Sequence, residues 1–170
     1  MKPTPIIRPE VETDTQAIRE ITRAAFEHMP FAAGDEHELI DTLRAQSRLY
    51  LSLVAQWQGQ VVGHIAFSRA TTDDHSALWF ALGPVSVTPS LHGMGIGAAL
   101  VEAGLKVLAD DGAAGCILTG DPDYYTRFGF VLAPELAPAG EPAEYFQIKV
   151  IRGPLPSGKI YFDAAFGSNA

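Results

Sequence analysis

The fold of this chain is decided by Leu82-Gly83-Pro84-Val85-Ser86-Val87-Thr88-Pro89-Ser90-Leu91-His92-Gly93-Met94-Gly95-Ile96-Gly97-Ala98-Ala99-Leu100. An apolar strand runs into a turn, three glycines follow at alternate positions, and a helix begins. Backbone N–H groups at a helix start have no partner within the helix, and the helix dipole adds about half a positive charge there. The stretch therefore predicts an anion-binding site at the start of this helix.

The composition is that of a globular protein. The chain has 170 residues, of which 47% are apolar and 19% charged, and we expect a single domain over residues 1–170. The net charge of −8 argues against a nucleic-acid partner and mildly favours a cationic or amine-bearing one. Cys116 is the single cysteine and stands in an apolar run, which predicts a buried, inert thiol and excludes an intramolecular disulfide.

The chain shows no targeting or membrane-spanning pattern. Its first residues lack the apolar core of a signal peptide, and no apolar run approaches the roughly 20 residues that span a bilayer. The five histidines show no metal-ligand spacing such as His-x-x-x-His. We therefore expect a cytoplasmic protein that binds no membrane and no metal.

Apolar periodicity and turn residues predict the order β-α-α-β-β-β-α-β-α-β-β. The expected strands are residues 6–11, 49–57, 61–68, 77–87, 114–119, 145–152 and 159–162, and the expected helices run from Asp14 to about His28, from Asp35 to about Gln46, from the glycines to Gly112, and from Asp121 to Gly129. Pro84 cannot donate a ladder hydrogen bond, so it predicts interrupted pairing within its strand. The strand–helix–strand unit around the glycines predicts one right-handed parallel crossover. The fold class is α/β, with a mixed, mostly antiparallel sheet and helices on both faces.

The glycines alone allow three interpretations. Gly93-x-Gly95-x-x-Ala98 formally fits a dinucleotide fingerprint, which would indicate a nicotinamide-dependent oxidoreductase. However, the fingerprint needs an acidic residue about 20 residues after the glycines, and Asp121 lies further on than that. The antiparallel strands expected before the glycines also disagree with the parallel sheet of a dinucleotide-binding fold. The glycines can also serve only to permit a tight strand-to-helix turn. The third interpretation is a pyrophosphate loop for coenzyme A.

Three segments carry a resemblance to the GNAT superfamily of acyl-CoA-dependent N-acyltransferases. Val85-x-Val87-x-Pro89 and His92-Gly93-Met94-Gly95-Ile96-Gly97 resemble the strand and Arg/Gln-x-x-Gly-x-Gly/Ala loop of that family, with His92 where Arg or Gln is usual. Asp121-Pro122-x-Tyr124-Tyr125-x-Arg127-Phe128-Gly129-Phe130 resembles its later Tyr-x-x-x-Gly-Phe signature, as found in a branch of bacterial acetyltransferases. The order of elements agrees over most of the chain.

The resemblance implies an enzyme that moves an acetyl group from acetyl-CoA to a primary amine by direct attack in a ternary complex. Backbone groups of Val85 and Val87 would hold the pantetheine arm. The pyrophosphate would bind at His92, Gly93, Met94, Gly95, Ile96, Gly97 and Ala98. Tyr125 would assist the departing thiolate, as a phenol can donate a hydrogen bond to it.

The acceptor amine and its base stay open. The implied acceptor is a small-molecule or peptide amine that would enter over the first two helices and residues 28–35, and a homodimer is one possible assembly. No spacing selects the general base, for which the candidates are Glu36, Glu38, His28, His37, His64 and Asp121. The alternative functions are a catalytically inactive CoA-binding or interaction module of the same fold and, less favoured, the nicotinamide-dependent oxidoreductase.

Overall fold

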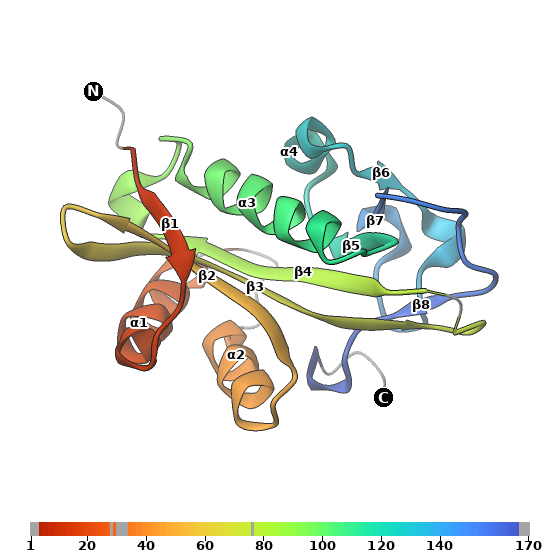
Figure 1. The fold of residues 1–170 in the computed structure, drawn as a ribbon, viewed down its shortest axis with the longest axis horizontal. Coiled ribbons are helices and arrows are strands. Elements are labelled where there is room, and N and C mark those ends of the chain that lie inside the picture. Colours follow the sequence, from red (N-terminus) through yellow and green to blue (C-terminus); the bar gives the residue numbers. More distant parts are fainter. Residues whose placement is uncertain (1–3, 28, 30–33, 76, 167–170) are drawn as a thin grey trace. The chain divides into compact units, whose positions relative to one another are not determined.

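The structure is a computed structural model that describes residues 4–27, 29, 34–75 and 77–166 (Figure 1). The chain forms two compact units, each with its own core. The first unit comprises Met1–Phe67 and Gly83–Leu105, and the second comprises Ser68–Leu82 and Lys106–Ala170. That the two act as a single domain stays a prediction.

The strands and helices follow the predicted order closely. They are β1 Ile6–Pro9, α1 Thr15–Phe26, α2 Glu36–Ala45, β2 Leu49–Trp57, β3 Gln60–Thr72, β4 Trp79–Val87, α3 Ile96–Asp110, β5 Gly115–Thr119, α4 Pro122–Tyr125, β6 Val131–Leu132, β7 Phe146–Val150 and β8 Ile160–Tyr161. Strands β3 and β4 and helix α3 each contribute residues to both units.

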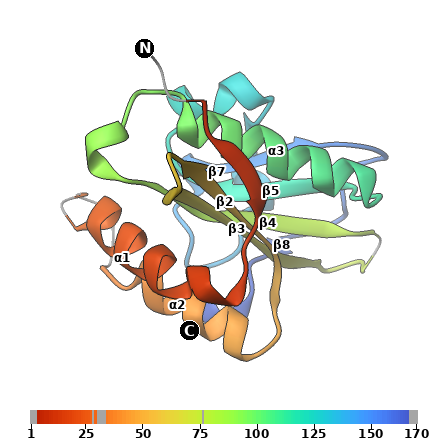
Figure 2. The ribbon, with the colours of Figure 1, turned by 60° about the vertical axis from the view of Figure 1, so that its left-hand side comes forward.

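The first unit is a short sheet between helices. Its strands are hydrogen-bonded in the order β1-β2-β3-β4, and β1 runs antiparallel to β2 with Ile6 opposite Gln56. Helices α1 and α2 cover one face and α3 covers the other (Figure 2). Ile18, Ile40 and Val54 form a buried cluster from α1, α2 and β2, as the helical spacing of apolar residues requires.

Helix α3 approaches β3 closely because two glycines leave room for it. A Cβ added at Gly63 would lie 3.1 Å from Leu100 Cδ1 and 3.2 Å from Ile96 Cγ2, and one added at Gly104 would overlap the ring of Phe67. Ile96 and Leu100 are fully buried. The start of α3 is therefore held firmly on the sheet, which fixes the position of the glycine loop that precedes it.

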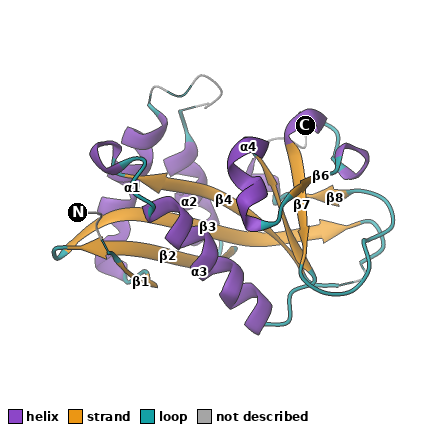
Figure 3. Ribbon diagram, turned by 90° about the horizontal axis from the view of Figure 1, so that it is seen from above, coloured by secondary structure: helices purple, strands orange, loops and turns teal. Residues whose placement is uncertain are grey.

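In the second unit the strand segments are hydrogen-bonded in the order β3-β4-β5-β7-β6. Only the pairing of β4 with β5 is parallel among those registered in this unit, which confirms the predicted crossover and the mostly antiparallel sheet. Its core is apolar and includes the buried aromatic residues Trp79, Phe146 and Phe162. Figure 3 shows α4 beside the short strand β6.

Three details differ from the sequence predictions. Strand β6 lies at residues to which the sequence assigns no element, since two exposed residues carry no periodic signal. Strand β3 extends to Thr72, and its added end pairs with β8. The predicted end of the first helix, His28, lies outside the described residues, and α1 ends at Phe26.

Candidate functional site

The glycine loop has the backbone that the sequence predicts. Gly93 and Gly95 adopt φ angles of +79° and +87°, which side-chain-bearing residues rarely adopt, and an added Cβ at either would meet nothing within 4 Å. Both glycines are thus required by conformation and not by packing. Helix α3 then starts at Ile96, with Ala99 N donating to Gly95 O at 3.1 Å.

The start of α3 presents several free donors. With Gly95 as the residue before the helix, the N–H groups of Gly95, Ile96, Gly97 and Ala98 precede the first possible intrahelical bond. The first turn carries no acidic side chain that would compete with an anion. Met94 is exposed beside these donors, whereas the side chain of Ile96 is buried in the core. The geometry suits a phosphate group.

The registered pairing of β4 with β5 ends before β4 reaches the loop. The parallel register covers three residue pairs, from Trp79 with Gly115 to Ala81 with Ile117. The interruption predicted from Pro84 is therefore confirmed, since β4 continues to Val87 while its registered pairing with β5 stops at Ala81. Val85 and Val87 lie on this last part of the strand.

His92 is bonded to the strand. Its Nε2 atom lies 2.8 Å from the carbonyl oxygen of Val87, five residues earlier in the chain. A carbonyl oxygen only accepts, so Nε2 carries the hydrogen and donates it. The structure thus brings Val85, Val87 and residues 92–98 together in the first unit. Within this unit, the Nε2–H group of His92 is used in the hydrogen bond to Val87.

Tyr125 lies in the second unit, at the end of α4. Asp121 begins this helix, as its carboxylate accepts a hydrogen bond from Asp123 N at 2.9 Å, and Gly129 ends the following turn with φ +92°. The Tyr125 ring packs edge-on against Phe130, with ring centroids 6.0 Å apart, and against Tyr124, with ring centroids 5.0 Å apart. Burial, with smaller effects from Tyr124, Cys116 and Asp121, raises the pKa of Tyr125 above its ordinary range.

Gly120 lies close to the Tyr125 ring, and Gln147 is hydrogen-bonded to Gly120. Gln147 is fully buried in β7, and its Nε2 atom donates to Gly120 O at 2.9 Å. A Cβ added at Gly120 would lie 2.8 Å from Cε2 of Tyr125, so a larger residue there would displace the ring. The sequence does not predict this hydrogen bond, because Gln147 and Gly120 are distant from each other in the chain. A single glutamine in a strand gives no local signal.

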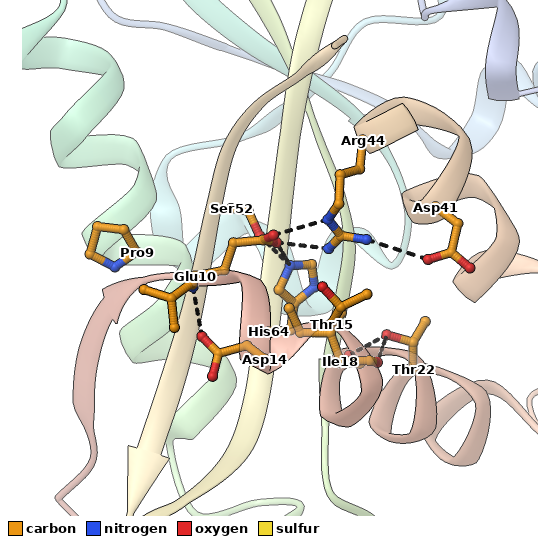
Figure 4. Close-up of polar contacts among 12 residues, drawn as sticks. Pro9, Glu10, Asp14, Thr15, Ile18, Thr22, Asp41, Arg44, Ser52 and His64 are labelled. Carbon is orange, nitrogen blue, oxygen red and sulfur yellow. Dashed lines mark hydrogen bonds and ion pairs between the residues drawn. The ribbon is translucent and has the colours of Figure 1, made fainter. Parts of the chain in front are cut away.

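A second feature missed by the sequence is a buried polar cluster in the first unit (Figure 4). Arg44 donates two hydrogen bonds to Glu10, at 2.9 and 2.8 Å. The Ser52 hydroxyl donates to the same carboxylate and lies 2.7 Å from His64 Nε2. Because its one hydrogen goes to Glu10, the contact with His64 requires Nε2–H of His64 to donate to Ser52.

Burial decides the charge state of His64 in this cluster, and hydrogen bonds decide that of Glu10. Burial lowers the pKa of His64 to about 4, opposed by Glu10 and Asp14 and assisted by Arg44. Burial alone would raise the pKa of Glu10, but the hydrogen bonds from Arg44 and Ser52 and the charge of Arg44 outweigh it and lower the pKa. His64 is thus a neutral histidine in a structural cluster, and Nδ1 of its ring has no hydrogen-bond partner among the described residues.

The other candidate bases are spread over the two units. Glu36 and Glu38 lie in the first turn of α2, where Glu36 accepts a hydrogen bond from Gly34 N at 3.2 Å. His37 is buried beside them, Asp121 caps α4, and His28 lies outside the described residues. His64 is inaccessible to an acceptor, since its side chain is 0% exposed. The choice of base therefore stays open among the others.

In the described part of the chain, no cluster of three or more His, Cys, Asp or Glu side chains could hold a metal ion. None of the helices in that part has both the length and the apolar character that crossing a membrane requires.

A family comparison agrees with the geometry of the glycine loop. The model of the acetyltransferase (GNAT) family matches residues 15–130. The chain is 36% identical over 129 residues to the uncharacterized N-acetyltransferase YhbS of Escherichia coli K12, which covers 75% of this chain and 74% of that protein. It is 35% identical over 138 residues to the uncharacterized N-acetyltransferase YjhQ of the same strain, which covers 79% and 72%.

Solved structures agree with this match. A GNAT family acetyltransferase from Brucella melitensis in complex with acetyl-CoA is 42% identical, with a TM-score of 0.85 over 96% of this chain and 98% of that one. YhbS from Escherichia coli in complex with CoA is 30% identical, with a TM-score of 0.86 over 98% of this chain and 94% of that one. The fold and both relatives point away from a dinucleotide-binding sheet.

Proposed function

Since the chain belongs to the GNAT acetyltransferase family, we propose that it moves an acetyl group from acetyl-CoA to a primary amine by direct attack in a ternary complex. The observation that carries this proposal is the loop in which Gly93 and Gly95 turn β4 into the uncapped start of α3. Its donors match the pyrophosphate of coenzyme A, and a 42% identical relative was solved with acetyl-CoA.

The cofactor contacts follow the strand and the loop. Backbone groups of Val85 and Val87 bind the pantetheine arm on the part of β4 that follows its registered pairs with β5. The pyrophosphate lies against residues 93–98, where backbone N–H groups of Gly95, Ile96, Gly97 and Ala98 donate to its oxygens. No metal ion takes part in this proposal.

Tyr125 assists the leaving group. The amine nitrogen attacks the thioester carbonyl carbon, the carbon–sulfur bond breaks, and the sulfur leaves as a thiolate while the nitrogen loses a proton to the base or to water. A thiol has a pKa of about 8.5, well below that of Tyr125, so complete proton transfer from the phenol is unfavourable. Tyr125 instead donates a hydrogen bond that strengthens as negative charge develops on sulfur.

The acceptor is a small-molecule or peptide amine. The net charge of −8 favours an acceptor that carries further positive charge. A cytoplasmic location and a homodimeric assembly stay predictions, of which light scattering on the purified protein tests the second.

A thiol-release screen tests the proposal. The protein is incubated with acetyl-CoA and a panel of polyamines, amino acids, aminoglycosides and peptides, and free thiol is measured for each. We expect release with at least one amine. CoA binding without release across the panel would favour an inactive binding module, whereas NADH binding without CoA binding would overturn the proposal.

Gly95→Glu is the matched negative control for the loop. The substitution places bulk and negative charge where the pyrophosphate would lie and forces φ +87° on a residue with a side chain. We expect CoA binding to fall below detection in calorimetry while circular dichroism stays unchanged. Unchanged CoA affinity would contradict the assignment of the loop.

A further inference from the structure

The peptide group between Val87 and Thr88 shows which way the end of β4 faces. Thr88 N donates to Val62 O at 2.8 Å, so this N–H points toward β3. In a trans peptide the C=O points opposite to the N–H, so the carbonyl of Val87 points away from β3. It therefore lies on the edge of β4 whose registered pairing with β5 stops at Ala81.

Strand alternation assigns the neighbouring groups to the same edge. Backbone groups of every second residue point the same way in an extended strand, so Val85 and Val87 share this edge and Ser86 does not. The edge offers two N–H groups and two carbonyls. These are the groups proposed above to bind the pantetheine arm.

One of these four groups is taken by His92. Its Nε2–H donates to Val87 O over 2.8 Å, and a compact turn makes this return possible, since Leu91 N donates to Thr88 O at 2.9 Å. While the ring is neutral, its other nitrogen holds a lone pair and cannot donate to a phosphate oxygen. The side chain thus faces the strand with its donor and has none left for the pyrophosphate.

We propose that His92 is a positioning residue of the coenzyme A site and not a phosphate ligand. Its hydrogen bond ties the strand end that receives the pantetheine to the loop that receives the pyrophosphate. It also leaves three groups for the ligand, the N–H and C=O of Val85 and the N–H of Val87. This inference rests on the proposed function, because it assigns His92 a role in binding the same acetyl-CoA.

A positioning role for His92 predicts different effects on the affinity for whole CoA and on the affinities for its two halves. His92→Ala removes the tie between strand and loop, so we expect CoA affinity to fall about tenfold, the size of effect that one neutral hydrogen bond can have. The affinities for the separate halves, 3′-phosphoadenosine 5′-diphosphate and pantetheine, should each change less than about twofold. A phosphate ligand would instead weaken the nucleotide half as much as CoA itself.

His92→Gln is the matched variant, because its amide N–H₂ can still donate to Val87 O. We expect it to restore CoA affinity to within about twofold of the unmodified protein. Calorimetric titrations of CoA and the two halves are made at low and high ionic strength, and the ratio between unmodified protein and His92→Ala should not depend on salt.

The outcomes are distinguishable from failure of the proposed function. If the unmodified protein binds no CoA, the assignment of the whole site fails. If it binds CoA but His92→Ala binds it equally well, or if the nucleotide half alone loses the affinity in a salt-dependent way, the positioning role is wrong. Should His92→Ala not fold, failure of His92→Gln to bind CoA like the unmodified protein would overturn the proposal by itself.

Discussion

His64 in the first unit and Tyr125 in the second show opposite consequences of the same physical effect. Burial disfavours the charged form of each, so it lowers the pKa of the imidazole to about 4 and raises that of the phenol. His64 is enclosed among Glu10, Arg44 and Ser52 and keeps a structural role. Tyr125 lies among aromatic rings and keeps its proton at neutral pH. A neutral group thus stabilises the fold in one unit and is available to donate in the other.

The largest effect that we expect is acid destabilisation through His64. The unfolded chain binds a proton at His64 near pH 6.5, whereas the folded chain does so near pH 4, so stability is present above pH 6.5 and is lost as the pH falls toward 4. The shift corresponds to about 3 kcal/mol. Below the ordinary pKa of Glu10 the lowered pKa of its carboxyl adds to the loss in the same direction.

Urea unfolding at pH 7 and pH 4.5 measures this term. The matched variant is His64→Gln, which keeps an N–H near the position of Nε2 and cannot titrate. We expect its free energy of unfolding to fall less between the two pH values than that of the unmodified protein, by about 2 kcal/mol. An equal fall in both proteins would show that His64 does not remain neutral in the folded state.

The second prediction tests the opposite member of the comparison. Tyr125→Phe removes the hydroxyl and keeps the ring, so kcat should fall about 100-fold while CoA affinity changes little. Because the pKa of Tyr125 is raised, this group should cause no loss of activity below about pH 10 in the unmodified protein. Steady-state kinetics and CoA calorimetry provide both measurements.

Tyr124→Phe is the control for that variant. Tyr124 also lies in α4, and its ring centroid is 5.5 Å from that of Phe128, as that of Tyr125 is 6.2 Å from it. Tyr124 is assigned no step of the reaction. We expect its kcat to stay within about twofold of the unmodified protein. If the two variants behave alike, Tyr125 only packs, and the contrast with His64 disappears.

The difference between local and long-range contacts, both found in the first unit, explains what the sequence could predict. The glycine loop was predicted from its residues because its cause is local, as a positive φ angle and a helix start leave a signature within a few positions. The cluster around His64 was not, because Glu10, Arg44 and Ser52 come from separate elements and meet only after folding. The sequence leaves His64 among the candidate bases, whereas in the structure its Nε2 is bonded to Ser52 and its Nδ1 has no partner among the described residues.

The surroundings of Tyr125 could be predicted from the sequence only in part. Its register to Gly129 and Phe130 is local and identified the residue, whereas the hydrogen bond from Gln147 to the nearby Gly120 depends on the pairing of β5 with β7 and on the turn after it. The sequence shows that His92 stands where Arg or Gln is usual, but it does not show the hydrogen-bond partner of the His92 side chain. The bond to Val87 follows only from the turn at residues 88–91.

The third prediction concerns a substitution that disrupts the polar cluster but leaves His64 unchanged. Glu10→Gln leaves Asp41, 3.3 Å away, as the remaining carboxylate partner of Arg44 and exchanges the acceptor of the Ser52 hydroxyl for a neutral amide. Because Arg44 is partly exposed, we expect a loss of about 2 kcal/mol in the free energy of unfolding at pH 7, below the about 3–5 kcal/mol typical of fully buried pairs. Urea unfolding measures it, and Arg44→Met in the same background should recover part of the loss, which a merely local packing defect at Glu10 would not allow.

The smallest effect concerns Gly120, which lies close to the Tyr125 ring. Gly120→Ala places a methyl group 2.8 Å from Cε2 of Tyr125. The ring must therefore shift by a few tenths of an ångström, although Tyr125 keeps its hydroxyl. We expect kcat to fall about threefold to tenfold with unchanged CoA affinity, since positioning of a donor governs its contribution in the transition state. In the Tyr125→Phe background the same substitution should cost nothing further, because there is no hydroxyl left to misplace. An additional loss there would mean that Gly120 acts on the fold and not on Tyr125.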